Sequence, residues 1–466
     1  MNLPVDVVKI VGYYAVSSLF DLMVLVRAGL LAPHCQALSY APMEYGDVDR
    51  AMRAIGAPML GHVRKLKLCE TSSDALLQRL ANLAPRLQEL DLGQCQGLSH
   101  TQTIGRFHAL RKLTMTRCTN FNGFQTDTLR ELDLTQCATV AGRLGPLTRL
   151  SLTCCILGPS FALSETLQHL TLCANRVGAD ANWCEGMELS HLTELQSLTI
   201  SCVNSFGNSQ ARVIERMQHL DTLSIKGCPR LTDYSFLPGL DRLRTLHVEG
   251  PFDWSMLRHL HLHVFSANQF RLRDLEHLST QRRLRSLRLD QTCMALGFNV
   301  GDPAEALSTL IADWPDLHTL DLFHCIRLLA THTFPVCPSV KCLKIDFCKL
   351  VDDDRLRRLL HSFPNVEVLS ANFTRVTDAG LASVPHGVRE LRLRGCRLTD
   401  AALPFLRPMR FLTMLDIAYS AVQHVAELPK SVRVIDVAGC ADSCIDSTRQ
   451  LVRGRRVKIK NMFAQP

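Results

Sequence analysis

A short apolar pattern recurs along most of the 466-residue chain and restricts its possible folds more than any other feature. Numbered from its first residue, the pattern has aliphatic residues at positions 1, 4 and 6, and usually cysteine or asparagine at position 9. In "VRELRLRGCRLTD" these residues are Val388, Leu391, Leu393 and Cys396. A spacing of about 23 residues between starts indicates a repeat protein. The starts are Val63, Leu87, Leu110, Leu129, Leu147, Leu167, Leu195, Leu220, Leu243, Leu257, Leu284, Leu317, Val340, Val366, Val388, Leu412 and Val432.

Each repeat predicts one strand and a segment that returns the chain to the next strand. In "LRELDL", Leu129, Leu132 and Leu134 alternate with polar residues towards the end, and this period of two puts the leucines on one face. A single strand of this kind buries too little surface, so stacked repeats would share one apolar core. The segments "DALLQRLANLAP" and "DDRLRRLLHSFP" have apolar residues three and four apart, which predicts outer helices.

Three segments carry a resemblance to a known family. "LDTLSIKGCPRLTD", "VRELRLRGCRLTD" and "VEVLSANFTRVTDAGL" resemble the cysteine-containing subclass of leucine-rich repeats. The resemblance covers about Val63 to Cys440 and implies an α/β solenoid, a horseshoe with a parallel β-sheet on its concave face. We expect about 16–17 repeats over residues 63–441. A linker or cap at 41–62 would precede them, and a basic cap or tail at 442–466 would follow.

The 19 cysteines are explained mainly by this repeat. A small buried residue with a weak donor suits position 9, where the chain leaves the strand and the donor can meet a carbonyl of the turn. Nine cysteines occupy that position, and Asn175 occupies it in a tenth repeat: Cys95, Cys118, Cys137, Cys155, Cys228, Cys325, Cys348, Cys396 and Cys440. The odd count, and an N-terminus that does not resemble a signal peptide, predict a reducing, intracellular setting, cytoplasmic or nuclear. We expect no zinc site, because no paired C-x-x-C spacing is present.

The formal net charge of +8 gathers at one end of the chain. Six basic residues lie between Arg449 and Lys460 with no acidic residue after Arg449, which leaves about +2 for the rest. In "RRVKIKN" apolar and basic residues alternate, which favours a terminal strand protected by charge over a nucleic-acid or membrane patch. The apolar stretch "VGYYAVSSLFDLMVLVRAGLLA" is interrupted by Asp21 and Arg27, so we do not expect a membrane span.

Positions 3, 5 and 7 of each strand should form the inner face of the solenoid. Eleven of the 18 such positions in the six repeats from Leu110 to Leu220 are serine or threonine, and charges of both signs flank this middle part. A face of mixed sign suits a protein partner better than a phosphate backbone. The candidate target-binding residues are Asp91, Asp133, Ser151, Thr171, Thr199, Ser224, His261, Arg288, Asp321, Phe323, Lys344, Arg392 and Arg394.

One histidine run is a candidate of its own. "LRHLHLHV" would place His259, His261 and His263 on one face of a strand that starts at Leu257, where they could bind a metal or respond to pH. The alternative is that they are ordinary hydrated positions. Leu257 follows Leu243 by only 14 residues, so this start is either an irregular repeat or a false match.

The motifs of common enzyme classes are absent. The sequence contains no G-x-x-x-x-G-K-[ST], H-E-x-x-H, G-x-S-x-G or G-x-G-x-x-G. We therefore expect a non-catalytic protein that needs no cofactor.

The first forty residues do not follow the repeat. "LPVDVVKIVGYY" and "FDLMVLVRAGLL" predict two short helices, and together they resemble an F-box, although Gly12 replaces the usual aromatic residue and no tryptophan follows Arg27. The resemblance implies that residues 1–40 dock on a Skp1-like protein, and through it on a cullin. The residues that would be buried there are Leu3, Pro4, Val8, Val11, Leu22 and Leu25. The alternative is a helical cap on the first repeat.

These features together predict a substrate-recognition adaptor of a Skp1–cullin–F-box ubiquitin ligase, whose repeat face holds an unknown target protein. The rival hypothesis is a recognition scaffold of the leucine-rich-repeat type with no role in ubiquitin ligation. An enzyme or metal protein that uses the histidine run is a third hypothesis.

Overall fold

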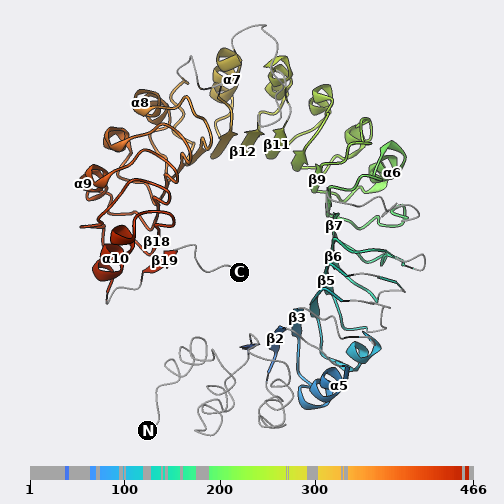
Figure 1. Cartoon of the computed structure of the whole chain (residues 1–466). Coiled ribbons are helices and arrows are strands. Elements are labelled where there is room, and N and C mark those ends of the chain that lie inside the picture. The colour runs from blue at the N-terminus through green and yellow to red at the C-terminus, as the bar shows by residue number, and fades with distance from the viewer. Residues whose placement is uncertain are drawn as a thin grey trace, which may run out of the picture. The chain divides into compact units, whose positions relative to one another are not determined.

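The computed structural model describes residues 37–40 and 63–460, apart from the internal segments 70–73, 94–97, 99–100, 119–126, 138–139, 142–144, 158–160, 175–187, 269, 271, 291–302, 327–328, 330–333 and 454–456. Contacts divide the chain into two compact units, Met1–Arg242 and Leu243–Pro466. In each unit the strands form one face and the helices and turns lie on the other side, as Figure 1 shows for α5 and α6 in the first unit and for α8 and α10 in the second.

The first unit consists of parallel strands that pair in chain order. They are β1 (Ala37–Tyr40), β2 (Lys65–Cys69), β3 (Glu89–Gly93), β4 (Lys112–Thr116), β5 (Glu131–Thr135), β6 (Arg149–Thr153), β7 (His169–Cys173), β8 (Ser197–Ser201) and β9 (Thr222–Lys226). Its helices are α5 (Asp74–Leu83), α6 (Asn208–Ala211) and the 3-10 helices η1 (Thr101–Arg106), η2 (Arg212–Arg216) and η3 (Leu237–Gly239).

The second unit repeats the same arrangement. Its strands are β10 (Thr245–Val248), β11 (Val264–Asn268), β12 (Ser286–Asp290), β13 (Thr319–Phe323), β14 (Cys342–Lys344), β15 (Val368–Ser370), β16 (Glu390–Arg392), β17 (Met414–Asp416), β18 (Val434–Asp436) and β19 (Lys458–Lys460), all parallel to their neighbours. Its helices are α7 (Pro303–Ala312), α8 (Asp353–Ser362), α9 (Leu403–Leu406), α10 (Asp442–Leu451), η4 (Trp254–His259), η5 (Leu272–Thr280), η6 (Asp378–Ser383) and η7 (Asp400–Ala402).

The core lies between the strands and the outer segments, as the repeat predicts. Leu132 pairs in register with Leu113 and Leu150, and all three side chains are buried. Burial of one leucine side chain contributes about 2 kcal/mol, and every repeat adds several. The described chain is therefore a leucine-rich-repeat-like solenoid, and the predicted fold class is confirmed.

The predicted role of the position-9 cysteines is also confirmed. The Sγ atoms of Cys155, Cys348 and Cys396 donate to Leu134 O (3.3 Å), Leu322 O (3.1 Å) and Ala371 O (3.1 Å), each at position 6 of the preceding repeat. Each strand ends near that carbonyl, and the thiol of the next repeat adds a hydrogen bond between the two repeats. Cys95 and Asn175 lie outside the described residues.

Position 8 has a backbone conformation that the sequence pattern does not reveal. The residue there has a positive φ in repeat after repeat, which turns the chain out of the strand. Glycine occupies some of these positions, and larger residues occupy the rest: Arg117, Gln136, Cys154, Cys202, His324, Phe347, Phe373 and Tyr419. The left-handed conformation costs a residue with a Cβ atom about 1–2 kcal/mol.

The start at Leu257 is a false match, and the prediction of a strand there is wrong. Leu257 belongs to the 3-10 helix η4, where its side chain is buried, and the strand of this repeat is β11, which follows Leu262. The error has a simple cause. A core-facing leucine of the outer helix precedes the next buried leucine, Leu260, by three residues and so imitates the first two apolar positions of a repeat.

The two ends of the described chain differ in how well the sequence predicts them. The terminal strand in "RRVKIKN" is confirmed, because β19 pairs with β18 and Ile459 lies opposite Ile435. At the other end, Ala37–Tyr40 forms a strand that pairs with β2, one strand before the first start at Val63. The sheet therefore includes a strand for which the repeat pattern gives no signal.

Candidate recognition surface

The strand face of the first unit contains the predicted target-binding residues in one continuous row. Position 5 of each repeat pairs in register with position 5 of the next repeat. Along most strands half-buried residues alternate with buried ones, and the half-buried residues, which include position 5, point away from the core. The row is Asp91, Thr114, Asp133, Ser151, Thr171, Thr199 and Ser224. Short hydroxyl side chains therefore form a strip that can exchange hydrogen bonds with a partner.

Ion pairs between neighbouring strands lie at one end of this row. Lys65 Nζ is 2.7 Å from Glu89 Oε1, and Lys67 Nζ is 2.9 Å from Asp91 Oδ2. Lys112 Nζ is 3.3 Å from Glu131 Oε2. The side chains are substantially exposed, so each pair contributes about 0–1 kcal/mol to stability. Their main consequence is a surface with charges of both signs rather than one basic field.

The second unit has a position-5 row of its own, and part of it consists of charged residues. Arg288, Asp321 and Lys344 pair in register on β12, β13 and β14. The Asp321 carboxylate is buried, and its Oδ2 lies 3.8 Å from both Arg288 Nε and Lys344 Nζ. Burial raises the pKa of Asp321, and the two cations oppose that rise only in part. No described residue donates a hydrogen bond to its Oδ1, so this oxygen is a polar atom without a protein partner in the described part of the chain.

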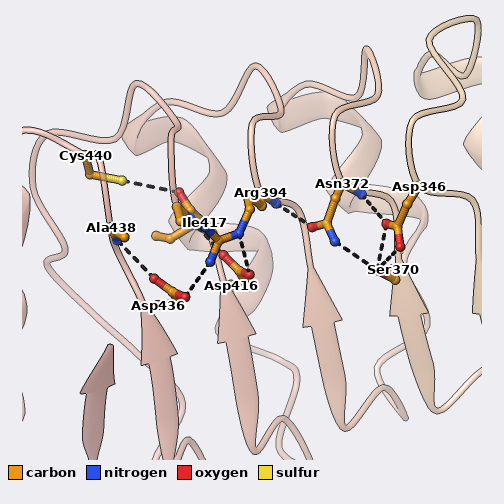
Figure 2. A network of polar contacts seen from close by, with 10 residues as sticks. Asp346, Ser370, Asn372, Arg394, Asp416, Ile417, Asp436, Ala438 and Cys440 are labelled. Carbon is orange, nitrogen blue, oxygen red and sulfur yellow. Dashed lines mark hydrogen bonds and ion pairs between the residues drawn. The ribbon is translucent and has the colours of Figure 1, made fainter. Parts of the chain in front are cut away.

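The Arg394 cluster joins polar side chains of five successive repeats. We define it as Asp346, Ser370, Asn372, Arg394, Asp416 and Asp436, which lie at the carboxyl ends of β14–β18 (Figure 2). Arg394 donates through Nη2 to Asp436 Oδ2 at 2.6 Å and through Nε to Asp416 Oδ2 at 3.2 Å. Burial raises the pKa of Asp416, although its hydrogen bonds from Ala418 N and Arg394 lower it.

Side chains in the other half of the cluster extend the backbone ladder beyond the short strands. Asp346 Oδ1 accepts a hydrogen bond from Asn372 N (2.7 Å), and Asn372 Oδ1 accepts one from Arg394 N (2.8 Å). Ser370 Oγ also donates to Asp346, at 2.7 Å. The side chain at position 7 of one repeat thus accepts a hydrogen bond from the backbone N–H at position 7 of the next. These hydrogen bonds connect Asp346 to Arg394 through Asn372.

The structure separates the sequence-predicted residues into three groups. Phe323 and Arg394 occupy position 7 of their repeats. Ten others occupy position 5 of their repeats, on the strands: Asp91, Asp133, Ser151, Thr171, Thr199, Ser224, Arg288, Asp321, Lys344 and Arg392. The prediction that His261 lies on the strand face is wrong, because His261 lies outside the strand. Ser266 occupies the expected position, between His247 and Arg288. Leu3, Pro4, Val8, Val11, Leu22 and Leu25 lie outside the described residues.

The histidine run does not form the arrangement predicted for it. His259 ends the helix η4, His261 lies between η4 and β11, and His263 precedes β11. They are therefore not three residues on one face of a strand. No group of three or more histidine, cysteine, aspartate or glutamate side chains that could hold a metal ion occurs among the described residues.

Apart from Arg394, the members of the Arg394 cluster are not among the candidate target-binding residues selected from the sequence, and two of the missed residues are aspartates that pair directly with Arg394. Asp416 and Asp436 occupy position 5 of the last two repeats and are buried beside Arg394. A signal was present, because the same count from Leu412 and Val432 that selected the other candidates also reaches these two residues.

Within the described helices, none is long and apolar enough to cross a membrane.

Comparisons with known proteins give only distant structural similarities. No family model matches the chain, and no curated protein sequence matches it. An internalin (inlF) of Listeria monocytogenes shares 14% identity over 90% of this chain and 96% of its own, with a TM-score of 0.31. The TLR13–ssRNA13 complex shares 13% identity over 84% and 64%, with a TM-score of 0.45. A leucine-rich-repeat protein of Leptospira interrogans shares 14% over 90% and 100%, with a TM-score of 0.32. Similarities this distant transfer neither a partner nor an activity.

Proposed function

We propose that the chain is a non-catalytic recognition protein whose strand face binds a protein partner. The observation that carries this proposal is the row of position-5 side chains, which stays in register from strand to strand within each unit and mixes hydroxyl groups with charges of both signs. A phosphate backbone would favour one sign of charge throughout. A folded protein surface offers donors, acceptors and charges of both signs, and this face can match them.

The finer proposal is that the chain is a substrate adaptor of a Skp1–cullin–F-box ubiquitin ligase. Its support is the F-box-like stretch at the N-terminus, with Leu3, Pro4, Val8, Val11, Leu22 and Leu25 as the docking residues, directly before the repeats. Such an adaptor performs no chemistry. It holds its target near the ubiquitin-transferring subunits and so raises the effective concentration of the reacting groups.

One observation favours the alternative, a recognition scaffold without a ligase partner. Strand β1, the last four residues of the predicted F-box-like segment 1–40, pairs with β2, so the sheet extends to Ala37–Tyr40. A segment that adjoins the first strands of a solenoid is well placed to cover the exposed end of its core, as terminal caps of repeat proteins do.

Co-purification separates these two proposals. The tagged full chain would be expressed with a Skp1-like protein, beside a Leu3→Ala/Pro4→Ala double variant and a Lys9→Ala variant as the matched control. The adaptor proposal expects binding by the parent and by Lys9→Ala, and loss of binding in the double variant. Absence of binding by a folded parent chain would leave the scaffold proposal.

A further inference from the structure

A row of aromatic side chains runs along the carboxyl ends of the strands in the second unit. We define this aromatic row as Phe323, Phe347, Phe373 and Tyr419. The ring centroids of Phe323 and Phe347 lie 5.2 Å apart, and those of Phe347 and Phe373 lie 4.7 Å apart in a stacked arrangement. Tyr419 continues the row two repeats after Phe373, because the repeat between them has Gly395 at the same position.

The aromatic row does not serve the core. Phe373 is 36% exposed and Tyr419 is 51% exposed, whereas the largest core side chains of the same unit are completely buried. Rings at these positions also have an unfavourable backbone. Phe347, Phe373 and Tyr419 have φ values of 60°, 56° and 55°, a region that bulky residues rarely occupy. Strained positions of this kind gather at binding and functional sites.

Glycine in the neighbouring repeats shows that the turn itself does not need an aromatic residue. Gly395 and Gly439 occupy position 8 with φ values of 65° and 68°. The rings of Phe373 and Tyr419 lie over these glycines, since an added Cβ atom would come within 2.5 Å of each ring. In the last repeats a ring therefore lies against a residue that leaves room for it, while parts of Phe373 and Tyr419 remain exposed to a partner.

The charges beside the row determine which partner fits. The Arg394 cluster contains three carboxylates, Asp346, Asp416 and Asp436, and one guanidinium, so it retains two negative charges. Asp346 accepts hydrogen bonds from neutral donors, Ser370 Oγ and Asn372 N. Arginine already lies over the two ends of the row, with Arg288 5.8 Å from the Phe323 centroid and Arg394 5.6 Å from that of Tyr419. Phe347 and Phe373 lie between these ends.

We propose that the aromatic row and the Arg394 cluster bind an extended, basic segment of a protein partner, with an arginine or lysine side chain directed towards Asp346. A cationic side chain and a carboxylate form a charge-assisted hydrogen bond, which is stronger than a neutral one. Apolar or proline side chains of the same segment would cover Phe373 and Tyr419. This inference rests on the proposed recognition function and names the chemistry of the target; it does not depend on the F-box.

A random dodecapeptide library displayed on phage, selected against the full chain, tests the proposal. We expect enriched peptides that combine arginine or lysine with aromatic, aliphatic or proline residues. Binding of the enriched peptides should fall at least about tenfold in a Phe373→Ala/Tyr419→Ala variant, because two exposed aromatic surfaces that contact apolar side chains are lost. The matched control is Phe411→Ala, since Phe411 is 60% exposed and lies outside the aromatic row.

A second variant isolates the charge. Asp346→Asn keeps an acceptor for Asn372 N and removes one negative charge, so we expect basic peptides to bind about tenfold more weakly while the fold is retained. The proposal is overturned if the selected peptides are acidic, if none is enriched, or if the double variant binds them like the parent. Tighter binding of a labelled random single-stranded oligonucleotide, lost in the double variant, would also overturn it. A chain that selects basic peptides but fails to bind a Skp1-like protein would retain this inference and lose only the adaptor role.

Discussion

The ring of Phe373 lies so close to Gly395 that a Cβ atom added at Gly395 would be 2.5 Å from Phe373 Cδ1. Gly395 also has a φ of 65°, so a side chain there would meet both a steric clash and a strained backbone. We expect Gly395→Ala to lower the free energy of unfolding by about 2 kcal/mol. Urea unfolding of the variant beside the parent measures this loss.

The matched control for that substitution is Gly387→Ala. Nothing lies within 4 Å of an added Cβ atom at Gly387. We expect this variant to unfold at the same urea concentration as the parent or slightly above it, because alanine lowers the entropy of the unfolded chain. Equal losses at Gly387 and Gly395 would contradict the steric explanation.

The thiol ladder predicts a second result. Cys396 Sγ donates to Ala371 O at 3.1 Å, and burial raises the pKa of the thiol, so it stays protonated at neutral pH and remains a donor. Cys396→Ala removes one of two donors to this carbonyl, since Thr374 Oγ1 also donates to Ala371 O at 2.8 Å, and should destabilise the chain by about 1 kcal/mol. Cys396→Ser retains a donor and should lose less. Thermal unfolding of both variants, with the half-buried Cys342→Ala as the control, checks the order.

The outer face has a ladder of its own, made by aspartate. Asp353 accepts hydrogen bonds from Thr377 N (2.8 Å, Oδ1) and Thr377 Oγ1 (2.6 Å, Oδ2), and so ties one repeat to the next. Asp353→Ala should therefore destabilise the chain by about 2 kcal/mol. Its neighbour Asp354 is exposed and pairs only with Arg357 within its own helix among the ion pairs described, so Asp354→Ala is the control and should have no measurable effect on the unfolding midpoint. Similar losses in both variants would show that net charge, rather than the ladder, is responsible.

Asp321 predicts a pH dependence of known sign. Its pKa is raised in the folded state by burial, so between the ordinary aspartate value and the raised one the folded chain binds more protons than the unfolded chain. The contribution of Asp321 to stability is therefore greatest below about pH 4 and decreases as the pH rises through the raised pKa. Asp321→Asn removes this dependence.

The measurement is the difference in urea midpoint between the parent and Asp321→Asn from pH 4 to pH 7. We expect the parent to lose stability relative to the variant as the pH rises over this range. Titrations shared by both proteins cancel in the difference. A difference that stays constant, or that changes in the opposite direction, would show that Arg288 and Lys344 offset the burial of the carboxylate completely.

The sequence was sufficient for the features that depend on neighbours along the chain. Alternation with a period of two and the return of the pattern after each outer segment determined the strands, their inward residues and the position-9 cysteines, because each repeat solves the same packing problem. Leu391, Leu393 and Cys396 are buried for this reason. The same count placed Arg288, Asp321 and Lys344 in one row, since parallel strands in register preserve position numbers.

Only the tertiary structure decided what depends on contacts between repeats. The sequence pattern around Leu257 resembles that of a strand. The segment is a helix in the structure, with Leu257 packed in the core. Phe373 and Tyr419 are ordinary residues in the sequence, and their role appears once the left-handed turn directs each ring over the glycine of the next repeat. Arg394 joins Asp416 and Asp436 across 22 and 42 residues of sequence. Such distances carry no local signal, because the energy that selects these pairings arises only when the repeats stack.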